Sequence, residues 1–409
     1  MEEYLSFVIV GHIDHGKSTL IGRLLYDTDS LPEEKIEEIK KTCEMLGKPF
    51  EFAYVMDHLD EEREKCITID TAQIFFKKGN RNYVIIDAPG HKEFIKNMLT
   101  GASQADAAIV IVDVDEGIEE QTRRHAYLLN MLGIKQVIVV FNKMDKVNYD
   151  KAKFEEVKLE LEKFLSNLGI NPSYMIPISA KEADNVVKKS GNMQWYEGPA
   201  VVEALESFKN RTSLRERPLR FPVQDFYEMD GKKIYVGRVE SGTIKRGDSV
   251  SVLPSGKTAK IMSIENFGPE LSEAYAGIST GVVFENDLNV GRGEVICGSE
   301  SSPEPKTRIN ANVFWMGNEP VKKGEMIIYK STTQETGCKI GKIERKINSS
   351  TLEILGTDSD ELSGLEAGEV SIELEKQIVV DDFNEIPPTG RFVLIKNGIV
   401  QGGGIVTRG

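Results

Sequence analysis

The chain has 409 residues, of which 40% are hydrophobic, and this is enough for several buried cores. At about 100–200 residues per domain, the length predicts two to four domains. Lys and Arg total 51 and Asp and Glu total 65, so the net charge is −14. This balance argues against a broad basic surface that wraps nucleic acid, although it leaves room for a local basic patch.

Cysteine usage and the N-terminus indicate a cytoplasmic protein. Four cysteines occur and none are spaced as C-x-x-C, which argues against a zinc site or a disulfide framework. The acidic start Met1–Tyr4 leads straight into a strand pattern and differs from a signal peptide. No apolar run approaches the roughly 20 residues of a membrane helix, so no membrane partner is expected.

The first half of the chain alternates strand and helix patterns. Four short apolar runs suit strands that are buried on both faces of a parallel sheet: Phe7–Val10, Tyr83–Ile86, Ala107–Val112 and Gln136–Phe141. Between them, helical spacing places Leu20, Ile21, Leu24 and Leu25 on one face. We therefore predict an α/β domain over residues 1–213, with ligand loops at the carboxyl ends of its strands.

The pattern of the sequence changes near residues 211–218. From there to the end, short alternating strands are punctuated by Gly, Asp and Pro, which is typical of an all-β sandwich or barrel. A polar, Pro-containing segment at 298–308 marks a second boundary. We predict two β domains, at 214–302 and 303–409.

The first chemical motif is "GHIDHGKS", which fits G-x-x-x-x-G-K-[ST] between a strand and a helix. Its glycines let backbone N–H groups surround phosphates, Lys17 adds a positive charge, and Ser18 offers a hydroxyl to Mg²⁺. The expected phosphate-binding residues are Gly11, His12, Ile13, Asp14, His15, Gly16, Lys17, Ser18 and Thr19. A similar segment, "SGKT" at 255–258, lacks the upstream glycine of the motif, and we interpret it as a hairpin turn.

Two further motifs follow in order. In "VIIDAPGH", a strand delivers Asp87 to a position where its carboxylate can hold Mg²⁺ through water, and Gly90 can offer its N–H to a γ-phosphate. In "FNKMD", Asp145 can accept the two donors of guanine, which adenine lacks. This guanine site comprises Asn142, Lys143, Asp145, Ser179, Ala180 and Lys181, the last three from "ISAK". Together the motifs predict GTP binding.

These motifs resemble the GTPase domain of the translation-factor class of GTP-binding proteins. The resemblance implies a P-loop GTPase domain followed by two β-barrels, with GTP and Mg²⁺ as cofactors. It implies that His91 is catalytic and orients the attacking water, that Thr68 completes the Mg²⁺ shell, and that Asp14 can lie near a monovalent cation.

Two groups within this class share the helical insert Leu31–Phe50: elongation factor 1-alpha and the GTPase subunit of sulfate adenylyltransferase. Residues 310–325 and 381–395 resemble the sulfate adenylyltransferase subunit more closely. Elongation factors carry a histidine-containing tRNA-contact sequence in the third domain, whereas no histidine follows His125 here.

The resemblance to the sulfate adenylyltransferase subunit implies that GTP hydrolysis drives formation of adenosine 5′-phosphosulfate from ATP and sulfate. It also implies a separate small catalytic subunit as partner, and it disfavours nucleic acid. The alternatives are an elongation-factor-type GTPase that delivers aminoacyl-tRNA, and a GTP-dependent binding switch no longer tied to sulfate.

The stretch "EEREKCITID" matches the first switch region of this class, except that Cys66 stands where the family pattern has glycine. If the family uses glycine there to adopt a positive φ, a cysteine strains one state of the switch by roughly 1 kcal/mol. If the glycine serves flexibility, cysteine stiffens the loop.

Overall fold

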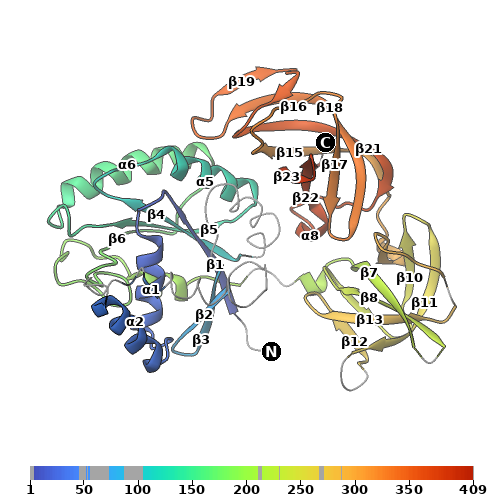
Figure 1. Cartoon of the computed structure of the whole chain (residues 1–409), viewed down its shortest axis with the longest axis horizontal. Helices are drawn as coiled ribbons and strands as arrows, with labels where there is room; N and C mark the ends of the chain where they lie inside the picture. The colour runs from blue at the N-terminus through green and yellow to red at the C-terminus, as the bar shows by residue number, and fades with distance from the viewer. Residues whose placement is uncertain are drawn as a thin grey trace. The chain divides into compact units, whose positions relative to one another are not determined.

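The computed structural model describes residues 4–45, 52, 54–55, 73–86, 105–210, 214–229, 231–266, 271–286 and 288–408. The chain divides into two compact units, Met1–Arg211 and Thr212–Gly409. Figure 1 shows helices and a sheet in the first unit and strands in the second. The three domain ranges predicted from the sequence remain a prediction, because both β domains fall within one compact unit.

The first unit is built on a six-stranded sheet of order β2-β3-β1-β4-β5-β6, in which only β2 runs antiparallel to its neighbour. The strands are β1 Tyr4–Gly11, β2 Gln73–Lys78, β3 Arg81–Ile86, β4 Ala107–Asp113, β5 Gln136–Asn142 and β6 Tyr174–Pro177. The four strands predicted from apolar runs are confirmed. All seven residues of the central strand β4 are buried, and each buried Val or Ile contributes about 1.5–3 kcal/mol.

Helices cover both faces of this sheet, with α5 and α6 on one side and α1 and α2 on the other (Figure 1). They are α1 Lys17–Asp27, α2 Glu33–Met45, α5 Glu120–Met131, α6 Lys151–Asn167 and α7 Val201–Glu206. The predicted inner face of α1 is confirmed, since Leu20, Ile21, Leu24 and Leu25 are buried against β1 in one hydrophobic cluster. This packing fixes the start of α1 against the end of β1.

The second unit begins with a closed barrel of order β10-β11-β13-β8-β7-β14. Its strands are β7 Arg220–Met229, β8 Lys232–Arg238, β10 Ser249–Leu253, β11 Lys257–Glu265, β13 Ser279–Phe284 and β14 Val295–Gly298, with β9 Thr243–Lys245 pairing β12 Glu273–Tyr275 beside them. The β10–β11 hairpin contains "SGKT" at 255–258, so its interpretation as a turn is confirmed.

A second barrel follows, of order β17-β22-β23-β15-β21-β18-β19, and the β17–β18 pairing closes its ring. Its elements are β15 Lys306–Trp315, β16 Val321–Lys322, β17 Met326–Ser331, β18 Gln334–Asn348, β19 Ile354–Thr357, β20 Glu361–Leu362, β21 Glu366–Ile378, α8 Pro387–Gly390, β22 Arg391–Lys396 and β23 Ile399–Thr407. The predicted fold class, an α/β domain followed by two β-barrels, is therefore confirmed.

A buried ion pair joins the two barrels within the second unit. Arg220 of β7 is 3% exposed, and its Nε and Nη2 donate to the carboxylate of Asp381 at 2.9 and 2.8 Å. The hydroxyl of Thr389 donates to the same carboxylate at 2.6 Å. Across the described ranges of both units, no helix is long and apolar enough to cross a membrane.

Candidate nucleotide-binding site

The predicted phosphate loop connects β1 to α1. Gly16 precedes the helix with φ 94°, and a Cβ there would lie 2.3 Å from the side-chain nitrogen of Asn142. A Cβ on Gly11 would lie 2.3 Å from the backbone oxygen of Ile111. Both positions therefore require glycine, one for conformation and space and the other for space.

Lys17 reaches back across this loop. Its Nζ donates to the backbone oxygens of Gly11 and His12 at 3.0 and 2.9 Å. The ammonium group thus lies over the loop, beside the positive end of the α1 dipole, where an anion is favoured. Ser18 is exposed in the first turn of α1 and Thr19 is half-buried. An exposed hydroxyl next to a phosphate-binding loop fits a Mg²⁺ ligand.

Asn142, at the end of β5, joins the phosphate loop to the loop at 178–181. It is 3% exposed, its Nδ2 donates to the backbone oxygen of His15 at 2.9 Å, and its Oδ1 accepts from the N–H of Ala180 at 2.9 Å. Its side chain is thus fixed from both sides. Such a link transmits the position of one loop to the other.

Asp145 and Ser179 meet in the same region. The Ser179 hydroxyl, which is fully buried, donates to Oδ1 of Asp145 at 2.6 Å. The half-buried carboxylate of Asp145 is therefore oriented before any ligand arrives. Lys181 is exposed, with its Nζ 3.9 Å from Glu182. The predicted phosphate and guanine residues are brought to one edge of the sheet.

Two carboxylates that the sequence analysis did not assign complete this edge. Asp113 ends β4 and is fully buried, and Nζ of Lys143 lies 2.6 Å from its Oδ2. Burial alone would raise the pKa of Asp113, but hydrogen bonds from Lys143 and from the N–H of Asp115 outweigh it and lower the pKa below 3.8. A single carboxylate at the end of an otherwise apolar strand was the signal in the sequence.

Glu116 is the second missed carboxylate, and it contacts the phosphate loop through His15. The imidazole of His15 is fully buried, with Nε2 3.3 Å from Glu116 and Nδ1 3.4 Å from the backbone oxygen of Ile111. Burial lowers the pKa of His15 below 6.5 and favours the neutral ring. The end of β4 and the segment after it thus contact both the phosphate loop and the loop at 142–145.

The remaining predicted site residues lie outside the residues that the structure describes. They are Thr68, Asp87, Gly90 and His91, and the same holds for Cys66 in the first switch region. Of the predicted Mg²⁺ ligands, the structure therefore places Ser18.

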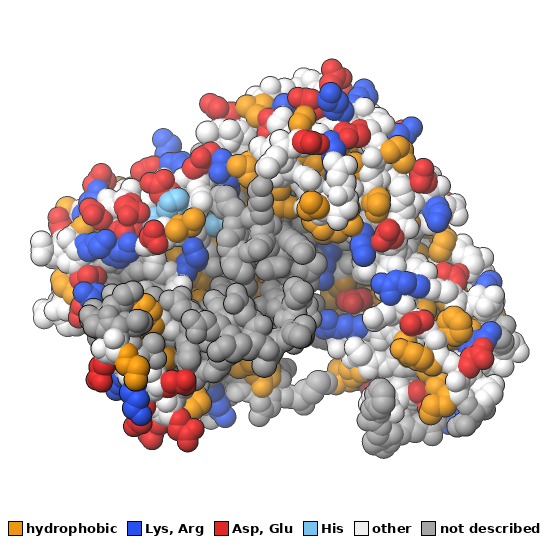
Figure 2. Space-filling view, in the orientation of Figure 1, with side chains coloured by type: hydrophobic (Ala, Val, Ile, Leu, Met, Phe, Trp, Pro, Cys, Tyr) orange, Lys and Arg blue, Asp and Glu red, His pale blue; other side chains and the backbone are white. Residues whose placement is uncertain are grey.

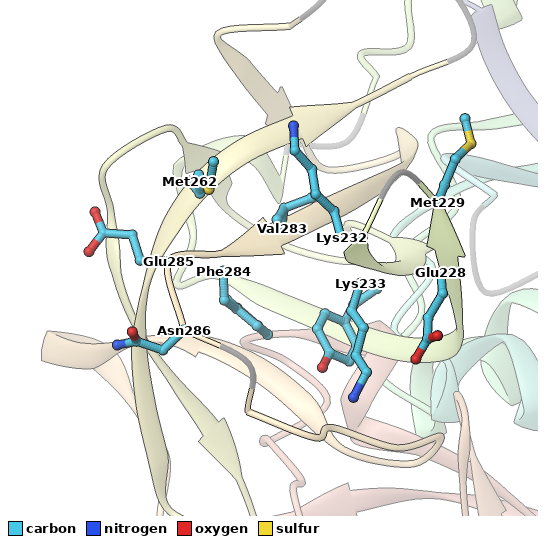
Figure 3. A pocket seen from close by; sticks show the side chains of 11 residues that line it. Glu228, Met229, Lys232, Lys233, Met262, Val283, Phe284, Glu285 and Asn286 are labelled. Atoms are coloured by element: carbon cyan, nitrogen blue, oxygen red, sulfur yellow. The ribbon is translucent and has the colours of Figure 1, made fainter.

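The first barrel has a hollow of its own, of about 610 Å³. Figure 3 shows Lys232 and Lys233 pointing in opposite directions from β8, with Phe284 of β13 nearby. The exposed Met229 and Met262 add apolar surface, and Glu228 and Glu285 add negative charge, whereas the rings of Tyr235 and Phe284 are only 1% and 5% exposed. The accessible lining therefore combines methionine side chains with charges of both signs.

The geometry of the first unit defines a class. P-loop GTP-binding domains combine three features: a strand–loop–helix that surrounds phosphates, an Asn-Lys-x-Asp loop at the end of a strand, and a third loop that supports it.

Comparison with protein-family models extends this result. The elongation factor Tu GTP binding domain matches residues 2–217, elongation factor Tu domain 2 matches 233–297, and the GTP-eEF1A C-terminal domain-like family matches 308–407. The chain belongs to the elongation factor Tu GTP-binding family, whose GTPases use GTP and Mg²⁺.

Similar proteins cover nearly the whole chain. It is 39% identical to elongation factor 1-alpha of Archaeoglobus fulgidus over 412 residues, which cover 99% of this chain and 97% of that protein. It is 40% identical to elongation factor 1-alpha of Thermoplasma volcanium over 403 residues, with 96% and 94% covered. A crystal structure of sup35 complexed with GDP covers 100% of this chain and 94% of that chain, at 24% identity and a TM-score of 0.45.

These relatives correct the expected function. The prediction of a sulfate adenylyltransferase subunit is wrong, because the similar proteins are named elongation factor 1-alpha over nearly their full length. The predictions of a small catalytic subunit as partner and of a chain that does not bind nucleic acid are therefore wrong as well. Net charge and missing histidines were weak grounds, because acidic and basic side chains are interspersed over the face in Figure 2 and a local contact depends on few of them.

Proposed function

We propose that this chain is an elongation-factor-type GTPase that binds aminoacyl-tRNA in its GTP state and releases it after hydrolysis. The observation that supports this most is the match to elongation factor 1-alpha at 39–40% identity over at least 96% of the chain. The match includes all three parts in order, and the third part corresponds to the eEF1A C-terminal family. A cytoplasmic location goes with this role.

The proposed nucleotide contacts follow from the geometry. The N–H groups of the loop at 11–16 and the ammonium of Lys17 stabilise negative charge on the β- and γ-phosphates. Asp145 accepts the N1–H and 2-amino donors of guanine, and its hydrogen bond from Ser179 supports that orientation. Asn142 holds the two loops at a fixed separation.

Mg²⁺, when bound, neutralises phosphate charge, and we propose Ser18, Thr68 and, through water, Asp87 to hold it. His91 is proposed to orient the water that attacks the γ-phosphorus, so that GDP and phosphate are the products. Asp14, exposed at φ 63°, is proposed to lie near a monovalent cation. These assignments extend the family's chemistry to this chain residue by residue.

The hollow in the first barrel supports a nucleic-acid partner by its chemistry. Phosphates pair with lysines, and Lys232 and Lys233 line the hollow. Bases stack on exposed aromatic rings, and the neighbouring Phe226 and Tyr227 of β7 are 41% and 59% exposed. Lys233 also lies 6.0 Å from the ring centre of Phe226, so its charge is held near an aromatic surface. We propose that this hollow contacts part of the tRNA.

Protection of the aminoacyl ester tests the proposal. With GTP, the chain should slow spontaneous hydrolysis of an aminoacyl-tRNA, and with GDP it should not. Lys233→Ala should weaken the protection, whereas Lys153→Ala on α6 serves as a surface-lysine control. Equal hydrolysis with and without the GTP-bound chain would reject aminoacyl-tRNA as its ligand.

A further inference from the structure

The carboxylate of Asp113, at the end of β4, holds the side chain of Lys143. Asp113 is fully buried, and Nζ of Lys143 lies 2.6 Å from its Oδ2. Its Oδ1 accepts a hydrogen bond from the N–H of Asp115 at 2.9 Å. The backbone therefore fixes one oxygen of this carboxylate, and the other oxygen meets the ammonium group.

The backbone of Lys143 is fixed by the loop after β5. Lys143 has φ 66°, a conformation that a non-glycine residue keeps only where its surroundings hold it. Its backbone oxygen accepts from the N–H of Lys146 at 2.9 Å, and the N–H of Met144 donates to the backbone oxygen of Ile178 at 3.1 Å. Because both ends of the Lys143 side chain are held, the alkyl chain between them has a fixed course.

The order of the strands gives the direction of this course. β4 lies between β1 and β5, and Asp113 is the register partner of Asn142 in the parallel pair of β4 and β5. The side chain of Lys143 therefore runs from the end of β5 to the end of β4, towards the phosphate loop after β1. A nucleotide with its phosphates on that loop and its base at Asp145 crosses the same edge of the sheet.

The ion pair decides whether Lys143 stays on this course. A free lysine side chain samples many rotamers, so it leaves a fixed position unless a partner holds it. Although burial opposes it, the hydrogen bonds from Lys143 and from the N–H of Asp115 lower the pKa of Asp113, so the carboxylate is charged at neutral pH. Since the two charges balance, Lys143 offers a nucleotide chiefly its apolar stem.

We propose that Asp113 is a positioning residue for nucleotide binding, which pairs with the ammonium of Lys143 and so lays the alkyl chain of Lys143 against the base and ribose of a guanine nucleotide. The inference rests on the proposed nucleotide contacts of the loop at 11–16 and of Asp145. Without the carboxylate, the ammonium leaves a site that lacks its counter-charge, and the alkyl chain leaves the nucleotide. Faster release of the nucleotide follows.

The experiment measures the release of a fluorescent GDP derivative from the full-length chain after addition of excess GDP. Asp113→Asn should speed this release about fivefold to twentyfold, the size expected for the loss of one hydrogen bond to a charged group. Lys143→Ala removes the chain itself and should speed the release at least as much.

A double variant shows whether Asp113 acts through Lys143. In Lys143→Ala no side chain remains to be positioned, so adding Asp113→Asn should not speed GDP release further. A purely structural role of Asp113 would instead multiply the two effects. This comparison also holds if Asp113→Asn alone folds poorly, because the double variant leaves neither charge without its partner.

Asp106→Asn is the matched control for the loss of a carboxylate. Asp106 directly precedes β4, at the opposite end of the strand, and its Oδ2 accepts from the N–H of Ser6 at 2.9 Å. GDP release from this variant should stay within about twofold of the wild type, because the substitution lies far from the nucleotide edge. Thermal unfolding of every variant measures how much stability each substitution costs.

Two outcomes overturn the inference. One is that Asp113→Asn releases GDP as slowly as Asp106→Asn, and the other is that the double variant releases GDP about fivefold or more faster than Lys143→Ala. Asp145→Asn separates these failures from failure of the proposed site. Xanthine carries an oxygen in place of the 2-amino group of guanine, so Asp145→Asn should lose GDP and gain affinity for XDP. If it keeps its GDP affinity, the assignment of Asp145 is wrong, whatever the other variants do.

Discussion

Asn142 donates a hydrogen bond from Nδ2 to the backbone oxygen of His15 at 2.9 Å, and so links residues 127 positions apart. The same side chain accepts from Ala180, so that one amide connects the phosphate loop, the end of β5 and the loop at 178–181. A small, buried side chain thus links the phosphate loop to the loop at 178–181.

Asn142→Ala removes both of these hydrogen bonds and leaves two buried backbone groups unpaired. GDP affinity should fall by about two orders of magnitude, from a loss of about 2–3 kcal/mol. Isothermal titration calorimetry measures this directly. Asn167→Ala, at the exposed end of α6, is the control, and an unchanged affinity for Asn142→Ala would contradict the linking role.

Asp113→Asn tests the buried pair with Lys143. The half-buried ammonium would lose its anionic partner, so the free energy of unfolding at pH 7 should fall by about 2–3 kcal/mol. Because the folded pKa of Asp113 is lowered, its stabilisation is present above 3.8 and is lost as the pH falls through the folded pKa.

Urea unfolding of the wild type and Asp113→Asn at several pH values tests both statements. The difference between the two proteins should be largest near neutral pH and should shrink as the pH falls below 3.8. A difference that stays constant down to strong acid would mean that the charge of Asp113 is not the source of the stabilisation.

His15 should make stability depend on pH in the range below 6.5. Its folded pKa is lowered by burial, so the neutral ring stabilises the fold fully above 6.5, and this contribution is lost as the pH falls from there towards the folded pKa. The His15→Gln variant should lose less stability than the wild type between pH 7.5 and 5.5. Parallel pH profiles of the two proteins would contradict this prediction.

Asp381→Asn weakens the ion pair that joins the two barrels. The loss for a buried, hydrogen-bonded guanidinium is expected at about 3 kcal/mol, seen as a lower unfolding temperature by calorimetry. GDP affinity should stay within about twofold of the wild type, since the described nucleotide-site residues belong to the other unit. A large loss of GDP affinity would show that the barrel junction affects the nucleotide site.

The sequence predicted the arrangement of Asn142, Asp145 and Ser179 because each follows a strand of one parallel sheet. The carboxyl ends of such strands meet at one edge, so linear order is enough to bring these side chains together. The same reasoning predicted the buried face of α1 from its spacing.

The supporting contacts were not predictable in this way. Asp113 meets Lys143, and Glu116 meets His15, across more than 29 residues. Such contacts depend on how side chains pack rather than on a local pattern. Lys143 also has a positive φ, with no glycine to mark it.

The functional prediction failed for a different reason. One fold hosts many functions, so the partner that a chain binds depends on particular side chains rather than on the fold. Local similarity at 310–325 and 381–395 therefore favoured one group, whereas identity over nearly the full length favours elongation factor 1-alpha.

The affinity of the chain for an aminoacyl-tRNA, measured by filter binding in the presence of a non-hydrolysable GTP analogue and of GDP, tests the proposed function most directly. The proposed function predicts binding about 5-fold to 150-fold tighter with the GTP analogue, since a coupling of about 1–3 kcal/mol is typical between two sites. It also predicts that the affinity falls with rising salt, because phosphates are contacted. Equal affinity in both nucleotide states, or none in either, would contradict it.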